Sequence, residues 1–182
     1  HRVAAAVVAA GGHDVGTRTL SQYADRIEPV ADDLILAAGL LQLHGSAQLL
    51  GWVKHPSPDA AVFGLAEVDQ IREGFAAVRE AFGPVDVLVN HASAAQWKGL
   101  LDSSVEDFES AWAVNGRGAF VCSQEAVADM REAGGGTVIF TGATSAVRSR
   151  GGAIGFTAAK FAARGMAMDI AQEYGPEDVH VA

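Results

Sequence analysis

The polar side chains that could do chemistry gather in one stretch of the chain, from Gly136 to Lys160. A β-rich run over 137–141 leads into a polar loop that holds Thr144 and Ser145, and Lys160 follows on the first turn of a helix rich in small residues. In an open parallel α/β sheet, ligand sites form at the carboxyl ends of the strands, where polar groups from several loops converge. We therefore expect a binding or catalytic site at this edge of a sheet.

Two asparagines add to this set. Asn115 lies in the middle of a predicted helix among apolar residues, and asparagine is a poor helix former that needs hydrogen-bond partners when it is buried. Gly116 and Gly118 follow it, so we expect the helix to kink there. Asn90 ends a predicted buried strand over 85–90 and begins the sequence Asn-His-Ala-Ser.

Taken together, these segments resemble the short-chain dehydrogenase/reductase family. That family carries Asn-Asn-Ala-Gly after its fourth strand, an asparagine in the next helix, a serine after the fifth strand, and Tyr-x-x-x-Lys at the start of the following helix. Here Asn90 begins the first motif, Asn115 matches the helix position, Ala143 falls at the serine, and Phe156 and Lys160 fall at the tyrosine and lysine. The match is close over roughly the second half of the chain and looser before it.

The resemblance implies a role for each matching position. The residue at Phe156 would be the general acid and base, while Lys160 would lower its pKa and hold the nicotinamide ribose. Asn115 would hold a water molecule in a proton relay to the lysine. Asn90 and Ala92, in the segment after the fourth strand, are the candidate cofactor-binding residues beside Lys160. The implied activity is NAD(P)-dependent oxidation or reduction of a small alcohol or carbonyl compound, and the implied assembly is a homo-oligomer.

Two departures from the family pattern leave two hypotheses open. Phe156 has no ionisable hydrogen and cannot do general acid–base work, and the side chain of Ala143 cannot hydrogen-bond a carbonyl. In the first hypothesis the protein is an oxidoreductase in which Ser145, Thr144 or a bound water supplies the proton. In the second it is a non-catalytic member of the fold that serves as a nucleotide-binding or oligomerisation module.

Composition limits the other classes of partner. The formal net charge of −9 argues against nucleic acid and anionic membranes, because neither attracts an acidic surface. Cys122 is the only cysteine, so no internal disulfide can form, and a reducing, cytoplasmic location is expected. The six histidines show no metal-ligand spacing, and no apolar run reaches the roughly 20 residues that span a bilayer.

The first ten residues allow two interpretations. In one, Val3 to Ala10 is the opening strand, and Gly11, Gly12 and Gly16 are the remains of a phosphate-binding loop. In the other, residues 1–10 end the first helix, and the glycine pair caps it. We prefer the second, because alanine forms helices well and strands poorly, and because glycine is typical just past a helix end.

This interpretation places the second strand at 13–17 and a helix over 21–39. Arg18, just past that strand, would then suit the 2′-phosphate of NADP, so NADP is the expected cofactor and NAD the alternative. The first strand and its Gly-rich loop would lie upstream of residue 1, and the last strands beyond residue 182, as in a fragment. We expect such a chain, taken alone, to bind a dinucleotide poorly.

The rest of the chain alternates strands and helices after an irregular insertion at about 40–58. That alternation predicts one α/β domain over 1–182 with a doubly wound, Rossmann-like parallel sheet. Beyond the segments named above, the expected elements are a strand at 60–65, a helix at 67–82, a long helix from a capping box at 103–106 to the glycines at 134–136, a helix at 156–173 and a strand beginning at 179.

Overall fold

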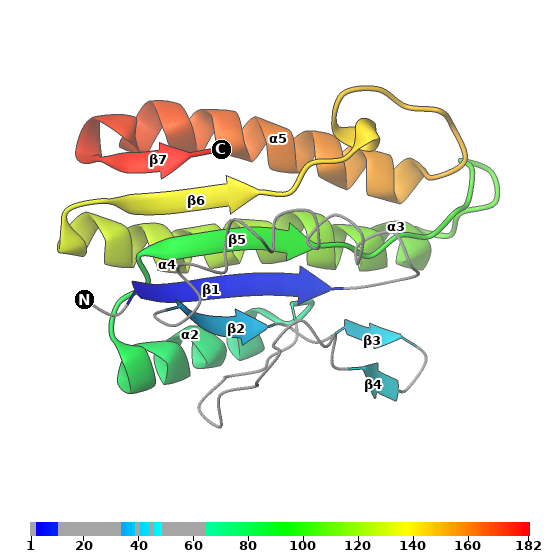
Figure 1. Ribbon diagram of the computed structural model, residues 1–182. Helices are drawn as coiled ribbons and strands as arrows, with labels where there is room; N and C mark the ends of the chain where they lie inside the picture. The colour runs from blue at the N-terminus through cyan, green and yellow to red at the C-terminus, as the bar shows by residue number, and fades with distance from the viewer. Residues whose placement is uncertain (1–2, 11–33, 39–40, 44–45, 49–64) are drawn as a thin grey trace.

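The structure is a computed structural model that describes residues 3–10, 34–38, 41–43, 46–48 and 65–182. Five parallel strands form one sheet in the order β2-β1-β5-β6-β7 (Figure 1). The order runs one way from β1 to β2 and the other way from β1 to β5, so the sheet is doubly wound, and the predicted α/β fold class is confirmed. The strands are β1 (Val3–Ala10), β2 (Leu34–Ala38), β5 (Val87–Ala92), β6 (Gly136–Phe140) and β7 (Val179–Val181).

Strand β1 corrects the preferred interpretation of the first ten residues. Val3–Ala10 is not the end of a helix but the central strand of the sheet, paired in parallel with β2 on one side and β5 on the other. Central parallel strands tolerate uninterrupted runs of small apolar residues, and pairing along both edges outweighs the weak helix preference of alanine. The predicted lack of the first strand is therefore wrong.

Strand β2 overturns a second expectation. Leu34–Ala38 is a strand and not the last part of a helix over 21–39, whose remaining residues lie outside the described part of the chain. Among the described strands, β2 pairs next to β1 and follows it in the sequence; the predicted strand at 13–17 lies outside the described residues. Arg18 precedes β2 in the sequence, and the residue itself lies outside the described ranges.

A short hairpin lies in the region predicted as an irregular insertion at 40–58. Strand β3 (Leu41–Leu43) pairs antiparallel with β4 (Ser46–Gln48). The rest of that region, and residues 60–64 of the predicted third strand, lie outside the described part of the chain.

The predicted helices of the second half are confirmed with small shifts. They are α2 (Val68–Phe82), α3 (Val105–Trp112), α4 (Ala119–Ala133) and α5 (Ile154–Tyr174). Helices α2, α4 and α5 lie along one face of the sheet (Figure 1). Between these helices and the sheet is an apolar core whose fully buried members include Ile71, Phe75, Leu88, Met130 and Val138.

Capping interactions fix the start of α3 and the end of α4. The capping box at the start of α3 uses Ser104 and Asp107, one residue later than predicted: the Asp107 amide donates to Ser104 Oγ at 3.1 Å, and the Ser104 amide donates to Asp107 Oδ2 at 3.0 Å. Gly134, with φ of 89°, caps the carboxyl end in the left-handed conformation that favours glycine. Gly136 then begins β6 where a Cβ atom would lie 2.8 Å from the Asp86 carbonyl oxygen. The carboxyl ends of β6 and β5 lie side by side, with Phe140 paired to Asn90.

Candidate active site

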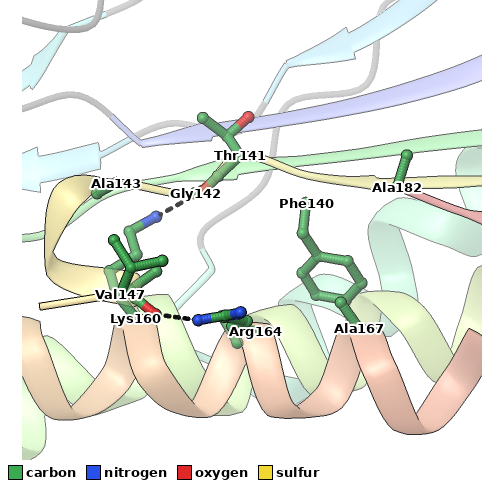
Figure 2. A pocket seen from close by; sticks show the side chains of 11 residues that line it. Phe140, Thr141, Gly142, Ala143, Val147, Lys160, Arg164, Ala167 and Ala182 are labelled. Carbon is green, nitrogen blue, oxygen red and sulfur yellow. Dashed lines mark hydrogen bonds between the residues drawn. The ribbon is translucent and has the colours of Figure 1, made fainter.

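Lys160 joins the carboxyl ends of two neighbouring strands. Its Nζ donates to the carbonyl oxygen of Ala92, at the end of β5, at 3.0 Å, and to that of Thr141, just past β6, at 3.2 Å. The residue is 6% exposed, and burial lowers the pKa of its amine to about 8. Lys160 lies on α5 among small residues, and its side chain points toward Thr141 at the end of β6 (Figure 2).

The buried amine of Lys160 should make the stability of the fold depend on pH. Between about pH 8 and 10.5 the unfolded lysine holds a proton that the folded one releases, so unfolding free energy should rise with pH across that window. The unfolding free energy should rise by about 3 kcal/mol in total across the window. Below pH 8 the folded lysine is charged, and the full penalty of burying that charge lowers the stability. Urea titrations of the wild type and Lys160→Met at several pH values check this. Equal pH slopes for the two proteins would contradict it.

Asn115 lies in a π-helical segment, Ala113–Gly118, that joins α3 to α4. The helix departs from α geometry where Gly116 and Gly118 predicted a kink, and such π segments are frequent at functional sites. The residue is 2% exposed. Its Oδ1 accepts from the Ala94 amide at 3.2 Å, and its Nδ2 donates to the carbonyl oxygens of Ala94 at 2.6 Å and Ala111 at 2.8 Å. Asn115 thereby holds the loop that follows β5, two residues beyond the carbonyl that binds Lys160.

Replacing Asn115 by alanine should cost about 1–3 kcal/mol of stability, because three backbone groups lose a buried partner. Chemical denaturation measures the change. Asp102→Ala, at an exposed position, is the control and should change stability by less than about 0.5 kcal/mol. Equal stability of Asn115→Ala and the wild type would show that these contacts do not hold the loop.

Phe156 packs against the Lys160 amine instead of offering it a hydroxyl. The ring is 8% exposed, and its centroid lies 5.8 Å from Nζ. Trp97, in the loop after β5 and 73% exposed, covers it with ring centroids 6.0 Å apart. The Phe156 and Trp97 rings are tilted by 51° to each other, and the three side chains form a row of contacts from the buried amine to the surface.

The hydroxyl candidates lie in the short turn after β6. Thr144–Ala146 forms a 3-10 turn; the Thr144 side chain is exposed, and Ser145 is half-buried. A cavity of about 230 Å³ opens at the same strand end, and its lining includes Lys160, Thr141, Ala143 and Arg164. Figure 2 shows these side chains around it. Neither Ser145 nor Thr144 is part of this lining, so the structure brings Lys160, but not these two predicted hydroxyl candidates, to the cavity wall, where the hydroxyl belongs to Thr141.

The strand-end segment Asn90–Ala92 divides its side chains between two sides. Asn90 is 3% exposed, and its Nδ2 donates to Ser123 Oγ of α4 at 3.1 Å, so it ties the strand to the helix layer. His91 Nδ1 lies 2.8 Å from Thr141 Oγ1, and burial together with the positive charge of Lys160 lowers the pKa of the imidazole. Ala92 takes part through its backbone, as the acceptor for Lys160. The sequence had pointed to Asn90 and Ala92 but could not show that one acts by its side chain and the other by its carbonyl.

The described residues also limit the ligand classes. Within 65–182 and the four strand segments before it, no group of histidine, cysteine, aspartate or glutamate side chains could hold a metal ion. In the same part of the chain, no helix has the length and apolar character to cross a membrane.

The sheet has a topological switch point, the feature at which dinucleotides bind in open α/β sheets. Strand order reverses at β1, whose carboxyl end pairs with that of β5, from Val8 against Asn90 to Ala10 against Ala92. Dinucleotides bind in the crevice at such a switch point. The Lys160 amine, buried without a carboxylate partner among the described residues, lies at the end of the next pair of strands, β5 and β6.

Comparison with known proteins gives the same fold. The short chain dehydrogenase family model matches residues 46–182. A 3alpha-hydroxysteroid dehydrogenase of Mediterraneibacter gnavus is 32% identical over 138 residues, which are 74% of this chain and 55% of that protein. An NADPH-dependent aldehyde reductase-like protein, chloroplastic, of Arabidopsis thaliana is 29% identical over 163 residues, 88% of this chain and 58% of that protein. The chain thus spans little more than half the length of these two curated relatives.

Solved structures share the fold of this chain. A short-chain dehydrogenase/reductase from Serratia marcescens BCRC 10948 superposes with a TM-score of 0.71 at 25% identity, covering 97% of this chain and 75% of that one. A gluconate 5-dehydrogenase from Burkholderia cenocepacia J2315, in complex with NADP and tartrate, shares the fold with a TM-score of 0.69 at 16% identity, covering 98% and 68%. With the family model matched over residues 46–182, the chain belongs to the short-chain dehydrogenase family.

Proposed function

We propose that the protein is an NAD(P)-dependent oxidoreductase that acts on a small carbonyl compound or alcohol. The observation that carries the proposal is the buried Lys160 amine, held by two backbone carbonyls at the carboxyl ends of β5 and β6. Relatives named as an NADPH-dependent aldehyde reductase, a hydroxysteroid dehydrogenase and a D-threitol dehydrogenase support this substrate class. When bound, the dinucleotide supplies or accepts the hydride; the chain binds, orients and handles the proton.

The cofactor proposal changes with the finding that Val3–Ala10 is the central strand. Gly11, Gly12 and Gly16 come directly after it in the sequence, with the spacing Gly12-x-x-x-Gly16. These residues lie outside the described ranges, but their place after a central strand favours the interpretation in which they belong to a phosphate-binding loop. The reason to expect poor dinucleotide binding is thereby removed. The expectation of NADP rested on placing Arg18 just past the second strand; Arg18 lies outside the described ranges, and we propose NAD(P) without choosing between the two forms.

A second candidate function is a binding or oligomerisation module without turnover. Phe156 and Ala143 favour it, because their side chains cannot give a proton or hydrogen-bond a carbonyl.

A homo-oligomer is compatible with either function. Large apolar side chains are exposed on three described helices, and such surfaces mark contacts with a partner. They are Val105, Phe108 and Trp112 of α3, Phe120 of α4, and Ile154, Phe161 and Met168 of α5. Size-exclusion chromatography with light scattering measures the assembly.

Turnover tests the proposed activity. The purified protein is mixed with NADPH or NADH and a panel of aldehydes and ketones, and with NADP or NAD and a panel of alcohols, while nicotinamide absorbance is followed. We expect turnover of at least one compound with one of the two cofactors. Binding of a cofactor with no turnover across the panel would favour the binding module, and neither binding nor turnover would contradict both candidates.

A further inference from the structure

The hydrogen bonds of Lys160 leave one N–H bond of its charged amine, or the lone pair of its neutral amine, available for proton transfer. A lysine nitrogen carries three hydrogens when charged, or two and a lone pair when neutral. Two positions are used by the carbonyl oxygens of Ala92 and Thr141. The third has no hydrogen-bond acceptor among the described residues, and Lys160 lines the cavity of about 230 Å³ at the strand ends.

Lys160 is the only amine among the described residues that line this cavity, and the one hydroxyl in the lining, on Thr141, lies 2.8 Å from His91 Nδ1. Ala143, at the serine position, has no transferable hydrogen, and Phe156, at the tyrosine position, has none either and is not part of the lining. Ser145 and Thr144 do not line the cavity. Arg164 lines it, with one nitrogen 3.5 Å from the Ala146 carbonyl oxygen, but an arginine stays protonated in proteins.

Among the described residues, no negative charge beside Lys160 opposes release of its proton. From β5, His91 lies near enough for the lysine's charge to lower the pKa of the imidazole. From α5 the nearby charge is Arg164, which is also positive, and the loop between β6 and α5 adds only Arg148 and Arg150, both exposed. In the described part of the chain no carboxylate pairs with Lys160; the one lysine ion pair there joins Lys98 to Asp107. Burial disfavours the ammonium form of Lys160, and among the described residues no carboxylate offsets it, as in lysines that act as acids or bases.

We propose that Lys160 is itself the proton-transfer group of this site, in place of the absent tyrosine. The proposal rests on the oxidoreductase function above. As the carbonyl carbon of the substrate is reduced by hydride from the nicotinamide, an N–H bond of the lysine breaks and an O–H bond forms on the substrate, directly or through one bound water. The electron pair stays on the nitrogen, and the neutral amine regains its proton from solvent. In alcohol oxidation the neutral amine accepts the proton.

The first test needs no activity. The sequence contains three lysines, Lys54, Lys98 and Lys160, so a sample labelled with ¹³C at lysine Cε gives few signals, and Lys160→Met identifies the one of interest. We expect the Lys160 signal to titrate near pH 8, well below the ordinary lysine pKa of about 10.4. A Lys160 midpoint at that ordinary value would overturn the proposal.

The second test separates proton transfer from cofactor binding. We expect Lys160→Met and Lys160→Arg both to lower kcat by roughly 10²–10⁴-fold, because arginine keeps the charge but cannot give up a proton. In the wild type, kcat for carbonyl reduction should fall above the Lys160 midpoint. Lys98→Met, which removes a surface lysine, should keep wild-type turnover.

The outcomes distinguish the proton-transfer role of Lys160 from the oxidoreductase function on which it rests. If Lys160→Arg turns over like the wild type, or if Ser145→Ala abolishes turnover while Lys160→Arg retains it, the proton does not come from Lys160, and the oxidoreductase function stands. If the wild type reduces nothing in the panel, the oxidoreductase function fails, and this role of Lys160 fails with it. Cofactor affinity of each variant, from nicotinamide fluorescence, shows whether a loss of turnover arises in binding.

Discussion

The double substitution Phe156→Tyr with Ala143→Ser should raise carbonyl-reducing turnover by roughly 10²-fold. A positioned general acid contributes roughly 10²–10⁴-fold, and we expect the lower end because Lys160 already supplies part of this work. The ring of Phe156 lies 5.8 Å from the Lys160 amine, so a phenol there would have the charged partner that lowers its pKa. Steady-state kinetics with NADPH and NADH measures the gain.

Phe161→Tyr is the matched control for this prediction. It adds a hydroxyl to the same helix at a position that is 44% exposed, and it should leave turnover unchanged. If the wild type shows no turnover and only the double variant reduces a carbonyl compound, the protein is a binding module with the fold of an enzyme. If the double variant gains nothing while it still folds and binds the cofactor, the site is not arranged for carbonyl reduction.

Replacing Asp129 by alanine should destabilise the fold by about 3 kcal/mol. Asp129 is 8% exposed, and its carboxylate accepts from Arg79 Nε at 2.8 Å and from the Val85 amide at 3.0 Å. The substitution leaves the buried Val85 amide without an acceptor and Arg79 with Glu125 alone as its ionic partner. Urea-induced unfolding measures the loss.

An exposed ion pair provides the comparison for Asp129. Arg131 and Glu177 are 2.7 Å apart with half-exposed side chains, so Glu177→Ala should cost less than about 1 kcal/mol. Similar losses for the two variants would mean that burial does not set the strength of these pairs.

The sequence predicted the second half of the fold well because its patterns are unambiguous there. Ile71, Phe75 and Val78 recur at helical spacing, and all three are buried on α2. The first third was misread because an Ala-Val run fits a helix and a central parallel strand equally well, and only pairing with β2 and β5 decides between them. The hairpin of β3 and β4 is made of three-residue strands, too short for any periodicity to show.

For the candidate site, the sequence could name residues but not their partners. Spacing alone singled out Lys160 and Asn115. Their acceptors are backbone carbonyls of Ala92, Thr141, Ala94 and Ala111, which carry no signal in residue type. The packing of Trp97 against Phe156 likewise depends on the path of the loop after β5, and no sequence motif indicates it.

Cofactor binding tests the central claim most directly, namely that Lys160 anchors a nicotinamide dinucleotide site. Titration calorimetry of NADPH and NADH into the wild type and Lys160→Met, both checked for folding, is the measurement. We predict a Kd for the wild type within roughly 1 μM–1 mM, the range of ordinary KM values, and at least about tenfold weaker binding by the variant. No binding of either dinucleotide by the folded wild type, or equal affinity of the two proteins, would contradict the claim.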